Sequence, residues 1–333
     1  MLPETLSSMN SESAKPRIIR HPHGIAAVDA EYVHPGHAAV HIIQNNGRGA
    51  FVDSGTNYSV PYLLAALEEV GLTRDAVDFV FLTHVHLDHA GGAGLLMSAL
   101  PNARLYVHPR GVQHMTDPSN LTAASQAVYG KEYFQRMYGD IQPIPRERIV
   151  SVQDNLDCDL GGRKLELIHT PGHALHHYAI VDRAHACIFA GDTFGISYRE
   201  LDTPQGEFIL PTTSPSQFDP EQLIASIDRM MAFHPESVYL MHFSRVRHPP
   251  RLAESLKSQI RELVRIVNES QSAADPHNAI KAAMLELWLG LLRRQGSTLP
   301  DADIARLLET DLELNAQGLL IWHQRQRRQN ASA

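Results

Sequence analysis

Leu82-Thr83-His84-Val85-His86-Leu87-Asp88-His89-Ala90-Gly91-Gly92 is the stretch of the sequence that decides how the rest of the chain is interpreted. It directly follows an apolar run that is typical of a buried strand. In an extended segment, side chains two positions apart point to the same side, so His84 and His86 can bind one ion together. Asp88 and His89 fall at the turn into a helix expected from residue 90 to residue 100, where they can face a second ion. The stretch therefore predicts a metal site at the end of a strand.

Residues of the same kind follow three later strand-like runs. These runs end in His169-Thr170-Pro171-Gly172-His173, in Gly191-Asp192-Thr193 and in His242. A site on a sheet edge requires ligands that converge from the ends of several strands, so we expect these residues to meet there. Histidines that are buried only for packing have no reason to recur at strand ends. Asp53, which ends an earlier strand, either supports the metal loop or forms a simple turn.

Length and composition set broad limits on the class of protein. The 333 residues can form one large α/β domain, or a domain with an appendage, around a sizeable core. Hydrophobic and charged fractions of 43% and 20% are ordinary for a globular protein, and the net charge of −8 argues against a nucleic-acid partner. Cys158 and Cys187 make neither a zinc-type pair nor a disulfide framework. Because we find no apolar run of membrane length and no secretion signal, we expect a cytoplasmic protein without a membrane partner.

The chain is predicted to have three parts. Residues 1–16, rich in Ser and Glu, are expected to be a disordered lead. Residues 17–249 alternate strands with helices, carry every motif above and form the expected catalytic domain. Residues 250–333 predict a C-terminal extension of helices separated by Pro and Gly.

A second helical segment interrupts the predicted catalytic domain at residues 109–145. Its Tyr and Phe side chains either pack in the core or form part of a pocket wall. We hypothesise that this insertion and the C-terminal extension together close an apolar pocket over the metals. The alternative is that the extension only covers other helices or forms the interface of a homodimer.

The order of these motifs resembles that of the metallo-β-lactamase superfamily. Thr-His-x-His-x-Asp-His, Pro-Gly-His, Gly-Asp and a late His at a strand end succeed one another over roughly residues 20–250. Neighbouring phrases such as His108-Pro109-Arg110-Gly111 are similar to a poorly characterised bacterial and archaeal hydrolase-like subgroup of it. The resemblance implies an α/β fold, a four-layer αββα sandwich with the site along one edge of its two sheets. The helical extension departs from the β-lactamases themselves.

The resemblance also implies a dinuclear metal site and an activity. Zinc is the first expectation for the two divalent ions, with iron or manganese as alternatives. The implied enzyme is a metal-dependent hydrolase, because such an ion pair acidifies water and stabilises an anionic intermediate. A metal-bridging hydroxide would attack an ester, thioester, lactone or similar bond of an unidentified small molecule, and Asp88 would orient it or take up its proton. In the family pattern the ligands are His84, His86 and His173 at the first ion, Asp88, His89 and His242 at the second, and Asp192 at both.

Some positions and functions stay open on the sequence alone. One member of the doublet His176-His177 either supports a ligand or lines the pocket, or the doublet packs at a strand start. No Tyr closely follows Asp192, which puts a lactone substrate in doubt, although Tyr198 could reach the site. Imidazole and carboxylate ligands also suit iron, so an iron-dependent redox enzyme of the sulfur dioxygenase kind is one alternative. A metal-containing binding protein with little turnover is another.

Overall fold

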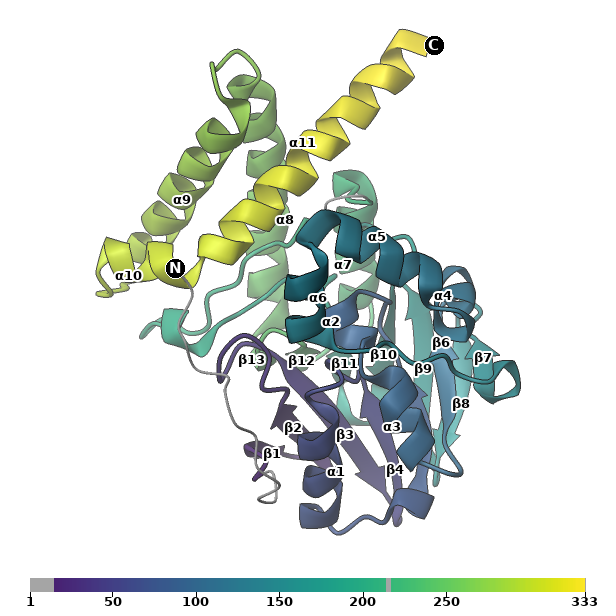
Figure 1. Cartoon of the computed structure of the whole chain (residues 1–333). Coiled ribbons are helices and arrows are strands. Elements are labelled where there is room, and N and C mark those ends of the chain that lie inside the picture. The colour runs from purple at the N-terminus through teal and green to yellow at the C-terminus, as the bar shows by residue number, and fades with distance from the viewer. Residues whose placement is uncertain (1–14, 214–216, 333) are drawn as a thin grey trace.

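Two mixed β-sheets form the centre of the computed structural model, which describes residues 15–213 and 217–332 (Figure 1). The predicted disordered lead lies outside the described residues, except for its last two positions. The first sheet follows the order of the sequence, with β1 (Ile18–His21), β2 (Ile25–Asp29), β3 (Ala39–Asn45), β4 (Arg48–Val52), β5 (Val77–Phe81), β6 (Arg104–Val107) and β7 (Ile149–Ser151). The second has the order β13 (Ser244–Arg247), β12 (Ser237–Leu240), β11 (Cys187–Phe189), β10 (Tyr178–Asp182), β9 (Arg163–His169) and β8 (Leu156–Leu160).

Turn chemistry and crossover helices explain this strand order. β3 and β4 are joined by Asn46 and Gly47, with φ of 47° and 76°, and such two-residue turns match the twist of antiparallel strands. From β4 to β7 the strands are parallel, and parallel neighbours need longer crossover connections. The crossovers are helical and consist of α1 (Val60–Glu69), α2 (Leu87–Ala90), α3 (Ala93–Ala99) and the insertion helices α4 (Val112–Thr116), α5 (Ser119–Tyr129) and α6 (Lys131–Tyr138).

Apolar side chains fill the space between the sheets and cover both outer faces. Phe81 of the first sheet and Phe189 of the second belong to one buried cluster between them. Leu63 of α1 and Leu96 of α3 pack on the outer face of the first sheet. On the outer face of the second sheet lie α7 (Pro220–Met231) and α8 (Pro249–Ser270). The four layers confirm the predicted αββα sandwich.

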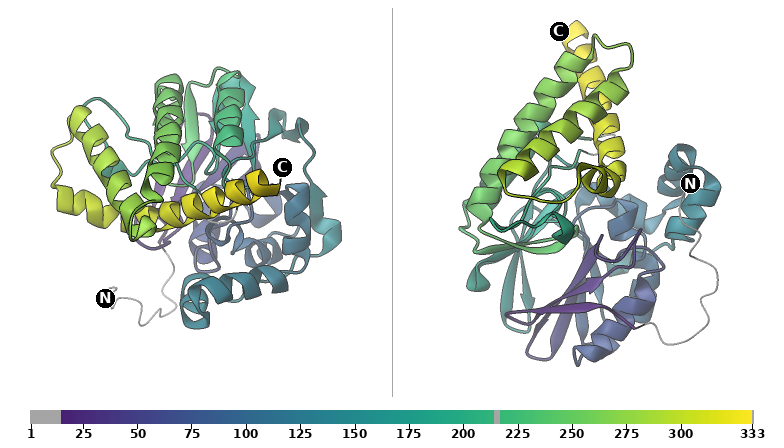
Figure 2. Two further views of the ribbon diagram at one scale, coloured as in Figure 1. Left: turned by 90° about the horizontal axis from the view of Figure 1, so that it is seen from above. Right: turned by 90° about the vertical axis from the view of Figure 1, so that its left-hand side faces the viewer.

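The C-terminal helices share a core with the second sheet. Leu256 and Ile260 of α8 are buried in the same cluster as Ile188 of β11. α8 is followed by α9 (Pro276–Arg294), α10 (Asp301–Leu307) and α11 (Glu309–Ser332). α9 and α11 pack on α8 and on each other, and α10 packs on α9 and α11. Figures 1 and 2 show this extension and the insertion helices on the same side of the sandwich as α2. In the described part of the chain, no helix is both long and apolar enough to cross a membrane.

The helix expected over residues 90–100 is two helices, α2 and α3. They separate at Gly91 and Gly92, where the chain passes very close to other backbone. A Cβ on Gly92 would lie 2.5 Å from the Thr56 carbonyl oxygen and 2.8 Å from that of Ser54. Because α2 begins at Leu87, Asp88 and His89 lie within a helical turn rather than before it.

Candidate metal centre

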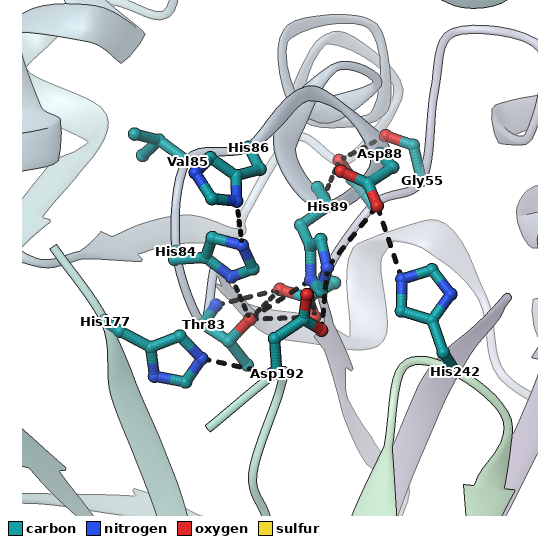
Figure 3. A network of polar contacts seen from close by, with 12 residues as sticks. Gly55, Thr83, His84, Val85, His86, Asp88, His89, His177, Asp192 and His242 are labelled. Carbon is teal, nitrogen blue, oxygen red and sulfur yellow. Dashed lines mark hydrogen bonds and ion pairs between the residues drawn. The ribbon is translucent and has the colours of Figure 1, made fainter. Parts of the chain in front are cut away.

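Three imidazoles meet where the chain leaves β5. In the short extended segment before α2, Nε2 of His84 lies 2.8 Å from Nδ1 of His86 (Figure 3). His173, in the loop that follows β9, brings its Nε2 to 3.1 Å from the same Nδ1. These three residues are called the first group below, and one ligand atom of each lies within 4.8 Å of those of the others.

A second group of potential ligands consists of Asp88, His89 and His242, which meet the same distance criterion. Asp88 and His89 lie in α2, and His242 follows β12 of the other sheet. Oδ2 of Asp88 is 3.3 Å from Nε2 of His242 and 3.7 Å from Nε2 of His89. The second group therefore draws on both sheets, as the first group does.

Asp192, in the loop after β11, lies between the two groups. Its Oδ1 is 3.2 Å from Nε2 of His89 in the second group. Its Oδ2 is 3.5 Å from Nε2 of His173 in the first group. One carboxylate thus presents a separate oxygen to each group, and the structure brings together all seven residues that the sequence nominated.

Burial and the surrounding charges set the proton balance of the centre. Burial and nearby imidazoles hold the pKa of His84 well below its usual value, and burial lowers that of His86 to about 3, so both rings are neutral at pH 7. Burial by itself would raise the pKa of Asp192, but the adjacent His89 holds it well below its usual range. Burial by itself would lower the pKa of His89, but the carboxylates around it, Asp192 first, raise it well above its usual value. The neutral rings of His84 and His86 and the ionised carboxylates favour a cation, and His89 would give up its proton when a metal ion binds.

The residues fit a divalent metal ion. Nε2 of His89 and Oδ1 of Asp192 are buried and lie 3.2 Å apart, yet neither atom makes a hydrogen bond. The two atoms form an ion pair without a hydrogen bond, and a cation that took the place of the His89 proton would be bound by both. Imidazole nitrogen and carboxylate oxygen are ligands that zinc, iron and manganese share.

Asp53 supports the motif loop from behind. Its carboxylate is 2% exposed and accepts hydrogen bonds from the Thr83 backbone N–H at 2.8 Å and from Nδ1 of His89 at 2.9 Å. The Thr83 hydroxyl donates to the same carboxylate at 2.9 Å. Of the two alternatives that the sequence left open, these contacts favour support of the loop, because they fix His89 with Nε2 directed at the site.

Both members of the His176-His177 doublet lie at the centre. Nε2 of His177 accepts from the Asp192 backbone N–H at 3.2 Å, so the neutral ring donates through Nδ1 to the Thr170 hydroxyl, 2.9 Å away. Nδ1 of His176 accepts from the Val85 backbone N–H at 3.4 Å. His177 therefore orients the loop of one nominated ligand, and His176 holds the backbone between two others.

Tyr198 approaches the second group but does not present its hydroxyl to it. The hydroxyl lies 3.2 Å from both carboxylate oxygens of Asp311, in α11, and donates to that carboxylate. The tyrosine ring stacks on His37 with centroids 5.3 Å apart, and the His37 carbonyl accepts from Nδ1 of His242 at 2.9 Å. His37 and Asp311 could not be recognised from the sequence, because neither belongs to a motif and both are distant along the chain from the residues they contact.

The insertion packs against the motif loop as well as into the core. Phe134 and Tyr138 of α6 form a small buried cluster with Leu87, which stands between His86 and Asp88 in the sequence. The Tyr138 hydroxyl lies 3.1 Å from that of Tyr32. The two interpretations of this segment are therefore not exclusive, and whether it closes an apolar pocket stays a prediction.

The family follows from a match over most of this fold. Residues 33–242, more than half of the chain, match the family model described as the metallo-beta-lactamase superfamily. The chain belongs to the metallo-β-lactamase superfamily. The predicted recognition is thereby confirmed, and the matched range runs from just before His37 to His242.

Individual relatives agree with this membership. The metallo-beta-lactamase fold-containing protein ST1585 of Sulfurisphaera tokodaii is 26% identical over 242 residues, which are 72% of this chain and 84% of that protein. Its crystal structure aligns with a TM-score of 0.62 at 22% identity, over 89% of this chain and 98% of that one. The crystal structure of the metallo-beta-lactamase family protein TTHA1429 of Thermus thermophilus aligns with a TM-score of 0.63 at 18% identity, over 91% of this chain and 94% of that one. The hydroxyacylglutathione hydrolase of Aeromonas hydrophila is 30% identical over 152 residues, which are 46% of this chain and 44% of that enzyme.

Proposed function

We propose that this protein is a dinuclear metal-dependent hydrolase that acts on a small molecule. The placement of Asp192 carries the proposal, since its two oxygens face His89 of the second group at 3.2 Å and His173 of the first group at 3.5 Å. Zinc sites take about four or five ligands, so one ion cannot use seven. In this proposal each group holds one ion, and Asp192 lies between them.

Divalent ions bound at the two groups would supply Lewis acidity, which lowers the pKa of water and polarises a carbonyl or phosphoryl oxygen. Asp88 is placed to orient a water molecule at the site. Burial by itself would raise the pKa of its carboxyl, but His89 and His242 hold it below the usual range, so the carboxylate is ionised and can accept a hydrogen bond from that water. Nε2 of His242, 3.3 Å from Oδ2, fixes the direction of that carboxylate.

We infer that the substrate carries an ester or thioester in preference to a lactone. The hydroxyacylglutathione hydrolase to which the chain is similar supports hydrolysis as the reaction class. The Tyr198 hydroxyl is engaged by Asp311, so it does not stand ready to assist the carbonyl oxygen of a lactone.

The test combines metal content with a substrate panel. Elemental analysis after metal supplementation should give two equivalents per chain, with zinc expected first, and the loaded protein should hydrolyse at least one generic ester or thioester. Binding of one equivalent or less would contradict the dinuclear site. Oxygen-dependent turnover with iron, in place of hydrolysis, would support the redox alternative instead.

A further inference from the structure

One turn of the C-terminal helix α11 touches both sides of the metal centre. Asp311 and Asn315 are four positions apart, and the Asn315 side-chain amide donates to the Asp311 carbonyl at 2.8 Å. Side chains at this spacing lie on the same face of a helix. Glu313, between them, instead contacts α9 through Nζ of Lys281 at 2.6 Å.

Asn315 is connected to the first group through the loop before α7. Its side chain is 2% exposed, and its Oδ1 accepts from the Thr213 backbone N–H at 2.6 Å. The Thr213 hydroxyl donates to the Asn315 carbonyl at 3.0 Å. The preceding residue, Thr212, offers its carbonyl oxygen to Nδ1 of His173 at 3.4 Å. Asn315 therefore fixes the backbone that determines which nitrogen of His173 faces the centre.

Asp311 is connected to the second group through Tyr198. Ser197, the residue before Tyr198, donates its backbone N–H to the His242 carbonyl at 2.5 Å. The Ser197 carbonyl accepts from the Phe243 N–H at 3.2 Å. The Tyr198 ring stacks on His37, whose carbonyl holds Nδ1 of His242. Because the Asp311 carboxylate anchors the Tyr198 hydroxyl, it fixes both the ring and the backbone against which His242 is set.

We propose that α11 is part of the metal centre, with Asn315 positioning His173 and Asp311 positioning His242. The inference rests on the proposed metal binding and adds a role for the C-terminal extension that the ligand motifs do not contain. Both residues act through others, so they are positioning residues and not ligands. Removal of a group hydrogen-bonded directly to a metal ligand typically changes metal affinity about 10- to 100-fold, and this is the upper limit expected here, because Asn315 and Asp311 act through Thr212 and Tyr198.

The experiment measures metal affinity in the full chain. Asn315→Ala and Asp311→Ala should each bind zinc more weakly in competition with a chelator, by about tenfold, the lower end of the range for groups that contact a ligand directly. Each should also alter the visible absorption of the Co²⁺-loaded protein, because a displaced imidazole changes the coordination geometry. The conservative variants Asn315→Asp and Asp311→Asn retain an acceptor oxygen and should recover most of the affinity. Glu313→Gln, on the opposite face of the same turn, should leave affinity and spectrum unchanged.

The outcomes separate this inference from the proposed hydrolase. If the wild type binds two ions and both alanine variants, folded by circular dichroism, match it in affinity and spectrum, the role of α11 is refuted. If an alanine variant does not fold, Asn315→Leu or Asp311→Leu decides, since leucine keeps the volume of the side chain without an acceptor oxygen. Weaker zinc binding than in Glu313→Gln supports positioning, and wild-type affinity refutes it. If the wild type binds metal without hydrolysing any ester or thioester while the variants bind more weakly, the inference stands and the proposed hydrolase fails.

Discussion

The contact between Asp53 and His89 offers a direct test of how the second group is held. Asp53→Asn keeps the size of the side chain but removes its charge. The carboxylate is 2% exposed and accepts from the Thr83 N–H, the Thr83 hydroxyl and Nδ1 of His89, at 2.8–2.9 Å. The asparagine oxygen can replace one carboxylate oxygen, but its NH₂ group then faces a second donor. His89 is therefore expected to lose its fixed orientation.

The magnitude follows from the kind of bond that is lost. A hydrogen bond to a charged group contributes about 1.5–3 kcal/mol, and about 1.4 kcal/mol corresponds to a tenfold change in an equilibrium constant. If this free energy appears in metal binding, affinity at the second group falls roughly 10- to 150-fold, in line with the range of about 10- to 100-fold typical of such supporting residues. We expect zinc titration against a chromophoric chelator to show that one ion binds more weakly than in the wild type and that the affinity for the other is almost unchanged.

The control for Asp53→Asn is a second buried carboxylate, which lies at the end of another strand and away from the metal centre. Asp182, at the end of β10, is fully buried and pairs with Arg163 and His185. Asp182→Asn should lower the free energy of unfolding but leave zinc affinity unchanged. Wild-type affinity for both ions in Asp53→Asn would refute the assignment of Asp53 as a support for His89.

Three further predictions concern catalysis, pH and packing. His173→Ala and Asp192→Ala should abolish hydrolysis while far-UV circular dichroism stays that of the wild type, and unfolding of both at room temperature would mean that the ions are structural. Burial lowers the pKa of His41 to about 3, so below about pH 6.5 the unfolded chain binds more protons than the folded protein. The metal-free protein should therefore lose stability as the pH falls from about 6.5 towards 3. This slope, up to about 1.4 kcal/mol per pH unit, should be smaller in urea unfolding of His41→Gln. Gly92→Ala should cost about 1–3 kcal/mol in the same assay, since its Cβ would meet two backbone oxygens within 2.8 Å, and an unchanged midpoint would contradict that packing.

The nominated ligands could be predicted from the sequence because their signal is local. His84 and His86 show the spacing of an extended segment, and His173, Asp192 and His242 each follow an apolar run that forms a strand. The structure places all of these strand ends at one edge of the sandwich. Residue type, spacing and strand position together were sufficient to predict that these residues meet.

The supporting residues Asp311, Asn315 and His37 could not be predicted, in contrast to Asp53 and His177, because their roles arise only from tertiary packing. Asp311 and Asn315 stand in a helix that carries no motif, and they reach loops about a hundred residues earlier in the chain. His37 contributes a backbone carbonyl, which no residue type reveals. The division between α2 and α3 has the same origin, since only the neighbouring strand loop shows why Gly92 cannot carry a side chain.

The shared core changes how the C-terminal extension can be tested. Removing the chain after residue 250 would delete Leu256, Ile260 and Leu263 of α8 and uncover the side chains of the second sheet that are buried with them, such as Ile188. Loss of activity on truncation would then report loss of a structural layer and would say nothing about a pocket. Single substitutions in α11 avoid this ambiguity, because α8 continues to cover the sheet.

The distribution of the proposed ligands over two sheets would make bound metal a cross-link as well as a cofactor. His84, Asp88 and His89 follow a strand of the first sheet, whereas His173, Asp192 and His242 follow strands of the second. An ion shared in this way closes large loops that are open in the unfolded chain, and the entropy of closing a loop rises only slowly with its length. An ion or molecule that binds only the folded state and is present at a thousand times its dissociation constant stabilises the fold by about 4 kcal/mol. Removal of the metal by a chelator should therefore weaken the contact between the two sheets. Amide hydrogen exchange should then accelerate in β5 and in β12 together, although the two strands belong to different sheets.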